Sequence, residues 1–275
     1  MRRKIGKITL AVAGLGLLAM GISSARADLL ANCPSTGDDT LFQNNVGNSS
    51  GVPGIFVGTD SNKAVKYGLM AFDVSSIPAG ATITGATLDL YVGMVAGSGG
   101  SNTTNFGPLR TIGLYDESQG WGASAKTAGS STFSGQGVAA ATGDATWSDA
   151  AFPSTAWTSG MAANITGSSV ALATTSGIPG TTNAEVLWTS AALATEVQGW
   201  VNTPSSNNGL ALVNSNSMSA QTFLGFWSAS GAANSGNGLA PDLVVSYVVP
   251  EPLSLSLVVF GMPILLCRRR RRALS

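Results

Sequence analysis

The chain contains no histidine and only two cysteines, Cys33 and Cys267. The absence of histidine excludes Ser-His-Asp and Cys-His nucleophile systems and His-ligated zinc. A single thiol in the central part of the chain argues against thiolate catalysis and cysteine-ligated metal. No Gly-x-x-x-x-Gly-Lys phosphate-binding loop occurs. A pair of carboxylates, as in glycoside hydrolysis, is the enzymatic arrangement that remains.

Six acidic residues are candidates for such a pair. They are Asp116, Glu117, Asp144, Asp149, Glu185 and Glu196. Neighbours on a strand point to opposite faces, so Asp116 and Glu117 cannot both line one cleft if a strand continues through them. The alternative for all six is an ordinary solvated turn acid, and we expect the protein not to be an enzyme.

Six tryptophans are the second chemical feature, because sugar rings lie flat on exposed aromatic faces. Trp121, Trp147 and Trp157 fall in or beside predicted loops and are the candidate glycan contacts. Packing beneath a long loop is the alternative for these three. The other three, Trp188, Trp200 and Trp227, fall on regular elements and are expected in the core.

Calcium is the candidate metal. Asp38, Asp39 and Asp242 could supply the loop carboxylates that a structural calcium ion prefers, although their spacing is not that of an EF-hand. Ordinary turn aspartates are the alternative. No other cofactor is expected.

Short apolar runs bounded by Gly, Ser, Asn and Pro predict an all-β protein. The clearest strand is 86–92, where Ala, Leu, Leu and Val alternate with Thr, Asp and Tyr. Other strands are expected at 54–58, 65–74, 111–115, 169–173, 185–189, 209–213, 222–227 and 243–249. Ser190 is expected to cap one short helix that buries Leu193, Val197, Trp200 and Val201. The pattern predicts one domain, 28–249, with an antiparallel, jelly-roll-like β-sandwich fold.

The N-terminus has the pattern of a signal peptide. Basic residues within 1–7 precede an apolar segment, 8–22, and Ala25-Arg26-Ala27 provides the small-x-small site that signal peptidase cleaves. We expect residues 1–27 to be removed, although an uncleaved N-terminal anchor is the alternative.

Removing both ends leaves a strongly acidic body. Between Asp28 and Glu251 the chain has four basic residues, Lys63, Lys66, Arg110 and Lys126, against 14 acidic ones, a net charge of about −10. Such a body should not bind nucleic acid, which requires Lys and Arg on phosphates.

The C-terminal segment, 250–275, combines three features in order. Pro250-Glu251-Pro252 precedes an apolar run, Leu253–Cys267, expected to be a membrane helix, and five arginines, Arg268, Arg269, Arg270, Arg271 and Arg272, end it as a cytoplasmic stop. This series resembles the PEP-CTERM sorting signal of Gram-negative bacteria. The resemblance implies export through the inner membrane, transient retention there, and transfer to the protease exosortase.

The segment Gly68–Val92 resembles the signature of DNRLRE-type domains, in which a Phe-Asp strand end, a Ser-x-Ile-Pro-x-Gly turn and a Thr-Leu-x-Leu-Tyr strand follow one another. Such domains are similar to jelly-roll carbohydrate-binding modules. The arginine that commonly precedes the Leu-x-Phe-Asp strand is absent, since Tyr67 and Gly68 stand there. Binding of acidic polysaccharide through that arginine is therefore not expected.

Together these features predict an exported, exosortase-sorted, non-catalytic protein of the cell surface or extracellular matrix. Its expected partners are signal peptidase, exosortase, the inner membrane and exopolysaccharide. Two alternatives remain: a structural or adhesion protein without a defined ligand, and a polysaccharide hydrolase that uses a carboxylate pair.

Overall fold

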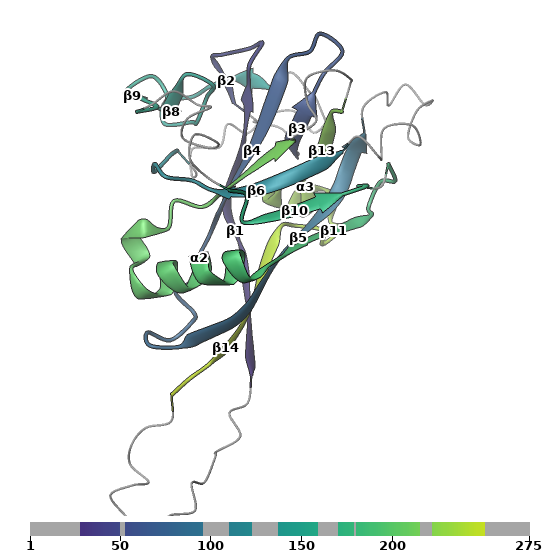
Figure 1. The fold of residues 1–275 in the computed structure, drawn as a ribbon. Helices are drawn as coiled ribbons and strands as arrows, with labels where there is room; N and C mark the ends of the chain where they lie inside the picture. Colours follow the sequence, from purple (N-terminus) through teal and green to yellow (C-terminus); the bar gives the residue numbers. More distant parts are fainter. Residues whose placement is uncertain are drawn as a thin grey trace, which may run out of the picture.

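The computed structural model describes residues 28–49, 53–95, 110–122, 137–158, 170–178, 180–214 and 222–250. These residues form antiparallel strands with two short helices, which confirms the prediction of an all-β protein (Figure 1). The strands are β1 (Leu29–Phe42), β2 (Asn48–Ser49), β3 (Gly54–Thr59), β4 (Val65–Phe72), β5 (Thr82–Val95), β6 (Thr111–Asp116), β7 (Val138–Ala139), β8 (Asp149–Ala151), β9 (Thr155–Ala156), β10 (Ala173–Ser176), β11 (Glu185–Thr189), β12 (Leu210–Asn214), β13 (Leu224–Trp227) and β14 (Asp242–Val248). The helices are α2 (Ala191–Asn202) and α3 (Ala229–Ser235).

Six of the strands close into a ring in the order β1-β14-β5-β13-β3-β4, and β4 pairs back with β1. Closure depends on two long strands, β1 and β5, of 14 residues each. Residues 29–34 of β1 pair with β14, and its second half pairs with β4 after a register shift between Ser35 and Gly37. Such an irregularity lets one strand bend from one sheet into the next. The sequence pattern predicted a sandwich and did not predict this closed ring.

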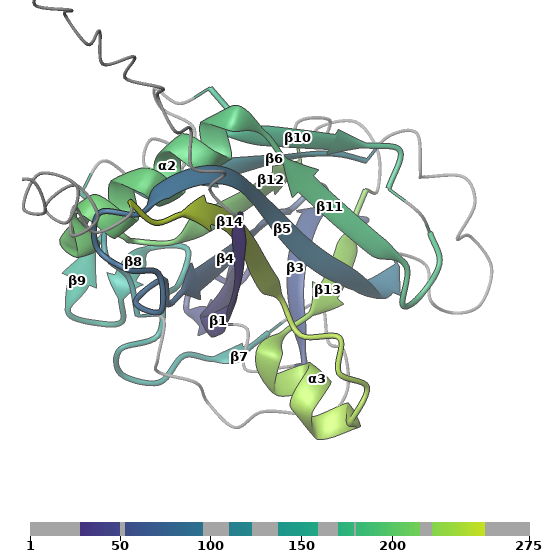
Figure 2. The same ribbon diagram turned by 90° about the horizontal axis from the view of Figure 1, so that it is seen from below.

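The outer strands extend the ring on two sides. Strands β12, β6 and β10 follow β4 in the sheet, and β11 pairs with β5. Figure 2, seen from below, shows β14 between β1 and β5. Leu29 at the start of β1 lies opposite Tyr247 near the end of β14. Both ends of the described chain therefore leave from the same end of the body (Figure 1).

The main core fills the space inside the ring and beneath α2. The predicted alternation in β5 is confirmed: Leu88, Leu90 and Val92 are fully buried, while the residues between them are partly exposed. Trp188 and Trp200 lie in the core as predicted. Trp227 does not, because its ring is only partly buried and its indole N–H donates to Asn183 Oδ1 at 3.0 Å.

Helix α2 follows the prediction residue by residue. The Ser190 hydroxyl accepts a hydrogen bond from the backbone N–H of Leu193 at 2.9 Å, which satisfies one of the free donors at the helix start. The buried residues of the helix are Leu193, Val197, Trp200 and Val201. The helix ends before Pro204, which opens a short 3-10 turn, Pro204–Ser206.

Several elements differ from the prediction, among them the short strands β2, β7, β8 and β9, which were not predicted. Strand β1 was not predicted, because Pro34, Gly37 and several polar residues interrupt its apolar pattern. Helix α3 is built from Ala, Ser, Gly and Asn and has no apolar periodicity to indicate it. The strand expected at 169–173 instead occupies Ala173–Ser176, where Ala173 pairs with Leu114 of β6.

Both terminal predictions fall outside the described residues. These are the signal peptide, 1–27, with Ala25 and Ala27, and the segment from Glu251 onward with Pro252 and Arg268–Arg272. Within the part of the chain that the structure describes, no helix is long and apolar enough to span a membrane. Pro250, the first residue of the predicted sorting motif, is exposed and lies two residues after the end of β14.

Candidate functional site

The three loop tryptophans meet on the outer face of the sheet formed by β4, β12 and β6. Trp121 follows β6, while Trp147 and Trp157 flank the small hairpin of β8 and β9. They pack with Leu41, Leu69, Ala145, Ala150, Ala211 and Val213 in a second apolar cluster, separate from the main core. The structure thus brings together all three candidates from different parts of the sequence.

Trp157 is the base of this cluster and not a surface residue. Its side chain is buried, and its indole N–H donates to the Thr146 carbonyl at 2.9 Å. Trp121 is partly exposed, and its indole N–H donates to the Asn208 carbonyl at 2.8 Å. For Trp157 the alternative of packing beneath a loop is confirmed.

Four aromatic rings remain partly exposed in this cluster: Tyr67, Tyr115, Trp121 and Trp147. We call them the aromatic face. Trp147 stacks on Tyr67, with ring centroids 5.5 Å apart and an interplanar angle of 20°. Burial, and then the neighbouring Tyr115, raise the pKa of Tyr67. The Tyr67 phenol is therefore neutral near pH 7.

Two glycines allow the aromatic face to form. A Cβ at Gly113 would lie 2.7 Å from Cε2 of Tyr115, so the tyrosine ring lies over a position that has no side chain. A Cβ at Gly122 would lie 1.5 Å from the Gly143 carbonyl oxygen. Gly122 also donates to the Ala150 carbonyl at 2.8 Å, which joins the Trp121 segment to the loop that carries Trp147.

Polar residues fix the loops around the aromatic face. Asp144 is buried, and its Oδ2 accepts from Ser49 Oγ at 2.9 Å and from the Ala141 N–H at 2.8 Å. Gln119 donates to the Ala156 carbonyl, and its Oε1 accepts from the Thr158 N–H at 2.9 Å. Asp144, one of the candidate acids, therefore has a structural role in holding its loop.

Two other candidate acids form a pair that the sequence did not indicate. Asp116 at the end of β6 lies close enough to Glu196 of α2 for a hydrogen bond between the two side chains. Burial, followed by the charge and the hydrogen bond of Glu196, raises the pKa of Asp116 to about 7. Asp116 therefore keeps its proton to a higher pH than an exposed aspartate does.

Glu117 is not part of that pair, as strand alternation predicts. It directly follows Asp116, the last residue of β6. Its side chain is fully buried, and Oε1 accepts from the Gln119 N–H at 3.3 Å. Burial is the main cause that raises its pKa to about 7, with a smaller contribution from Asp116.

The remaining candidate acids lie elsewhere. Asp149 is on β8, and its N–H donates to Thr146 Oγ1 at 3.0 Å. Glu185 is on β11, where its Oε1 accepts from the Tyr91 hydroxyl at 3.3 Å. The same hydroxyl is 3.1 Å from Oδ2 of Asp89. Burial, followed by the charges of Asp89 and Glu185, raises the pKa of Tyr91 to about 12.

The structure does not bring together the three aspartates proposed for calcium. Oδ2 of Asp38 accepts from the Ala229 N–H at 2.9 Å, at the start of α3. Oδ1 of Asp39 accepts from the Thr40 N–H at 2.7 Å. Asp242 lies on β14 opposite Asp89 of β5. Among the described residues, no group of three or more Cys, Asp or Glu side chains could hold a metal ion.

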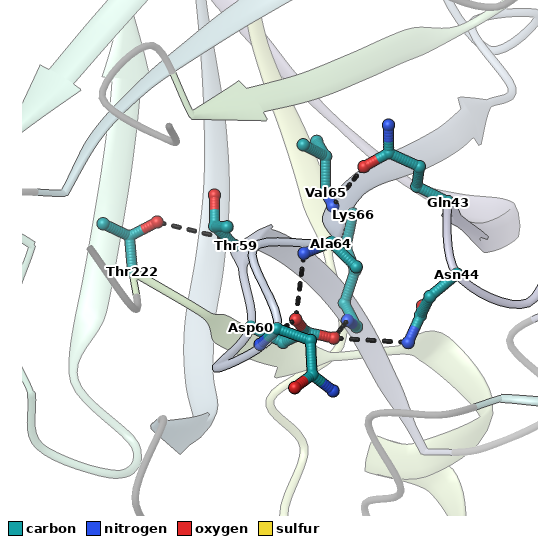
Figure 3. A network of polar contacts seen from close by, with 9 residues as sticks. Gln43, Asn44, Thr59, Asp60, Ala64, Val65, Lys66 and Thr222 are labelled. Carbon is teal, nitrogen blue, oxygen red and sulfur yellow. Dashed lines mark hydrogen bonds and ion pairs between the residues drawn. The ribbon is translucent and has the colours of Figure 1, made fainter. Parts of the chain in front are cut away.

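Sequence reasoning missed two buried cations. Lys66 on β4 and Arg110 before β6 are 1% and 0% exposed. Lys66 Nζ lies 2.8 Å from Oδ2 of Asp60, which also accepts from Asn44 Nδ2 at 3.3 Å (Figure 3). For Lys66 the sequence did contain a signal, because it is an isolated basic residue within an otherwise apolar strand. A charge in such a strand is costly to bury, so it requires a partner.

No protein-family model matches the chain, and a search of curated proteins finds no relative.

Proposed function

We propose that this chain is a non-catalytic, exported protein of the cell surface or extracellular matrix whose jelly-roll-like body binds polysaccharide through the aromatic face. The main observation is the group of four partly exposed rings, Tyr67, Tyr115, Trp121 and Trp147, which pack together over one face of the sheet. Rigid aromatic rings suit the C–H faces of sugars and lose little conformational entropy on binding. The likeness to DNRLRE-type modules supports the same assignment.

The arrangement of the carboxyls supports a non-catalytic role. The two carboxyls of a glycosidase stand about 5 to 9 Å apart, so that a sugar bond or a water molecule fits between them. Asp116 and Glu196 instead lie near enough for a hydrogen bond between their side chains.

Replacement of Trp147 tests the proposed binding surface. A glycan array with the full-length protein, prepared without sugar-based detergent, selects a ligand, and calorimetry then compares variants. We expect Trp147→Ala to weaken binding about tenfold, which corresponds to ~1.4 kcal/mol for a lost stacking contact. Trp227→Ala is the matched control, because Trp227 is also a partly buried indole but lies outside the aromatic face.

The array and one further assay also separate the alternatives. Absence of any glycan binding by the parent protein would favour a structural or adhesion role without a ligand. Release of new reducing ends by the parent, abolished in Asp116→Asn, would instead favour a hydrolase. Equal loss of affinity in Trp147→Ala and Trp227→Ala would contradict binding at the aromatic face.

The order of Pro250-Glu251-Pro252, the apolar run and the arginines supports sorting by exosortase in the inner membrane. The geometry of the body is compatible with a terminal tether, since β1 begins and β14 ends at the same end (Figure 1). The sorted protein would then lie at the cell surface or outside the cell.

Replacement of the sorting motif tests that proposal. We expect changing Pro250, Glu251 and Pro252 to alanine to leave uncut protein in the membrane fraction, detected by an epitope after Ser275. The control replaces the exposed turn Pro204–Ser206 by alanines. Equal release of the motif variant and the control variant would contradict sorting through this motif.

A further inference from the structure

Arg110 is a buried cation without a protein counter-charge. Its side chain is 0% exposed, and its Nε donates to the Thr222 carbonyl at 3.4 Å. The terminal nitrogens Nη1 and Nη2 are both buried and have no hydrogen-bond partner among the described residues. An unpaired buried charge costs several kcal/mol, so this arrangement requires an explanation.

Lys66 shows how the same fold neutralises a buried cation. Its ammonium contacts the Asp60 carboxylate at 2.8 Å and lies 5.3 Å from the ring centroid of Phe223. Figure 3 shows this ion pair close to Thr222, the residue whose carbonyl accepts from Arg110. Lys66–Asp60 is the one salt bridge among the described residues, and no carboxylate there pairs with Arg110.

The rest of the body cannot supply the missing carboxylate. The internal segments outside the described residues are 50–52, 96–109, 123–136, 159–169, 179 and 215–221, and their sequences contain no Asp or Glu. Every acidic residue between Asp28 and Pro250 is therefore a described residue, and none forms a salt bridge with Arg110. No carboxylate of the body therefore neutralises Arg110 in this structure.

The Arg110 guanidinium lies at the end of the six-stranded ring that is opposite the start of β1 and the end of β14. Strand β5 begins at Thr82, opposite Val248, and ends at Val95, opposite Leu224. Thr222, whose carbonyl accepts from Arg110, lies two residues before Leu224, the first residue of β13. Arg110 is therefore near the start of β13 and far from the C-terminal sorting segment. Other buried polar residues at this end are Thr59, which ends β3, and Asn214, which ends β12.

We propose that Arg110 anchors a binding site for a carboxylate monoanion at this end of the ring. The two terminal nitrogens of a guanidinium form a fork that matches the two oxygens of one carboxylate. A single negative charge balances the single buried positive charge. A dianion such as phosphate would leave an uncompensated charge in a body whose net charge is already strongly negative. The site is separate from the aromatic face and does not depend on the proposed glycan binding.

Thermal and denaturant unfolding of the full-length protein tests this site with acetate, glucuronate, glucose, phosphate and chloride as probes. We expect acetate and glucuronate to stabilise the parent protein saturably. At a hundredfold excess over Kd, the folding equilibrium constant should rise about a hundredfold. Glucose, phosphate and chloride at matched ionic strength should have no such effect. Indifference of the parent protein to both carboxylates would overturn the proposal without any variant.

Two variants assign the effect to Arg110. Arg110→Met should abolish the response to carboxylates and be at least as stable as the unliganded parent, since an apolar chain replaces an unpaired cation. Arg110→Lys should keep a weakened response, because an ammonium carries the positive charge but lacks the paired N–H donors of a guanidinium. An unchanged response in both variants would overturn the proposal.

The source of the carboxylate is distinguished by comparing acetate, glucuronate and a glucuronate-containing oligosaccharide. Equal affinities for all three identify a free small acid, whereas tighter binding of the oligosaccharide identifies an acidic sugar chain. Failure of this site and failure of the proposed glycan binding are distinguishable. Trp147→Ala should retain the response to acetate, and Arg110→Met should retain affinity for a neutral glycan.

Discussion

Asp60→Asn is expected to destabilise the protein by about 3 kcal/mol, because it leaves the Lys66 ammonium buried without a counter-charge. The Lys66 side chain is 1% exposed and the Asp60 side chain 14% exposed, so water cannot replace the lost partner. Burial alone would raise the pKa of Asp60, but hydrogen bonds from Lys66 and from the Ala64 N–H lower it overall. The carboxylate is therefore the form that the fold stabilises.

The asparagine variant isolates charge from hydrogen bonding. Oδ1 of Asp60 accepts from the N–H groups of Asn62 and Ala64 at 2.9 and 3.0 Å, and an amide oxygen can still accept both bonds. Asp60→Ala loses these bonds as well and should cost about 1 kcal/mol more. Urea unfolding measures both values. Asp28→Asn, at the exposed start of the described chain, is the control and should change stability by less than about 0.5 kcal/mol.

A double variant distinguishes an unpaired charge from a general packing defect. Adding Lys66→Met to Asp60→Asn removes the cation and keeps most of its apolar volume beside Phe42 and Phe223. The double variant should therefore regain at least about 1 kcal/mol relative to Asp60→Asn. A loss below about 1 kcal/mol in Asp60→Asn, or an additive loss in the double variant, would contradict this account.

The strands with alternating or continuous apolar residues could be predicted because local pattern and tertiary packing agree in them. This holds for β3 to β6 and β11 to β14, and for α2, where cap and buried face both follow the sequence. Strand β1 could not be predicted in this way. Its partners are β14 and β4, and those long-range pairings override Pro34 and Gly37.

The turn after β4 and the segment at the end of α2 meet in space, although they are distant in sequence. A cavity of about 340 Å³ lies between the turn after β4 and the end of α2. Its lining includes Asp73 and Ile77 from the turn, and Trp200 and Asn207 from the later segment. Asn207 Nδ2 donates to the Phe72 carbonyl at 2.9 Å. These contacts tie the turn after β4 to the end of α2.

The aromatic face was only partly predictable. Loop position indicated Trp121 and Trp147, which are partly exposed, but it gave no indication that Trp157 is buried or that Tyr67 and Tyr115 belong to the same surface. One signal was present. Strands β4 and β12 have apolar residues on both faces, such as Leu69 and Ala211 opposite the core face, which indicates a second covering layer. The residues that form this layer are determined by how the loops pack, and hydrophobic periodicity does not identify them.

The stability of the protein should fall as the pH rises from about 4 to about 7, owing to Asp116 and Glu117. Burial, with Glu196 as the next cause for Asp116, raises the pKa of both carboxyls to about 7 in the folded protein. The unfolded chain releases these protons near pH 4. Between the two values the folded state binds more protons than the unfolded state, so a rising pH favours unfolding.

The stabilising contribution of these two groups is thus complete below about pH 4 and lost once the pH passes about 7. We expect a decrease on the order of 3 kcal/mol for the coupled groups, since each tenfold change in proton affinity corresponds to about 1.4 kcal/mol. Urea unfolding at several pH values between 4 and 8 measures this slope. Asp60 and Asp73, whose pKa values are lowered, act in the opposite direction and only at more acidic pH.

Neutral variants separate these two carboxyls from the general charge of the body. In Asp116→Asn with Glu117→Gln no proton can be released, so the stability should change much less between pH 5 and pH 8. Asp28→Asn removes one exposed charge and should keep the parent slope. Glu196→Gln should reduce the slope less than the double variant does, because burial remains the main cause of both raised pKa values. Equal slopes in the parent protein and the Asp116→Asn, Glu117→Gln variant would show that self-repulsion of the acidic body, and not these buried carboxyls, sets the pH dependence.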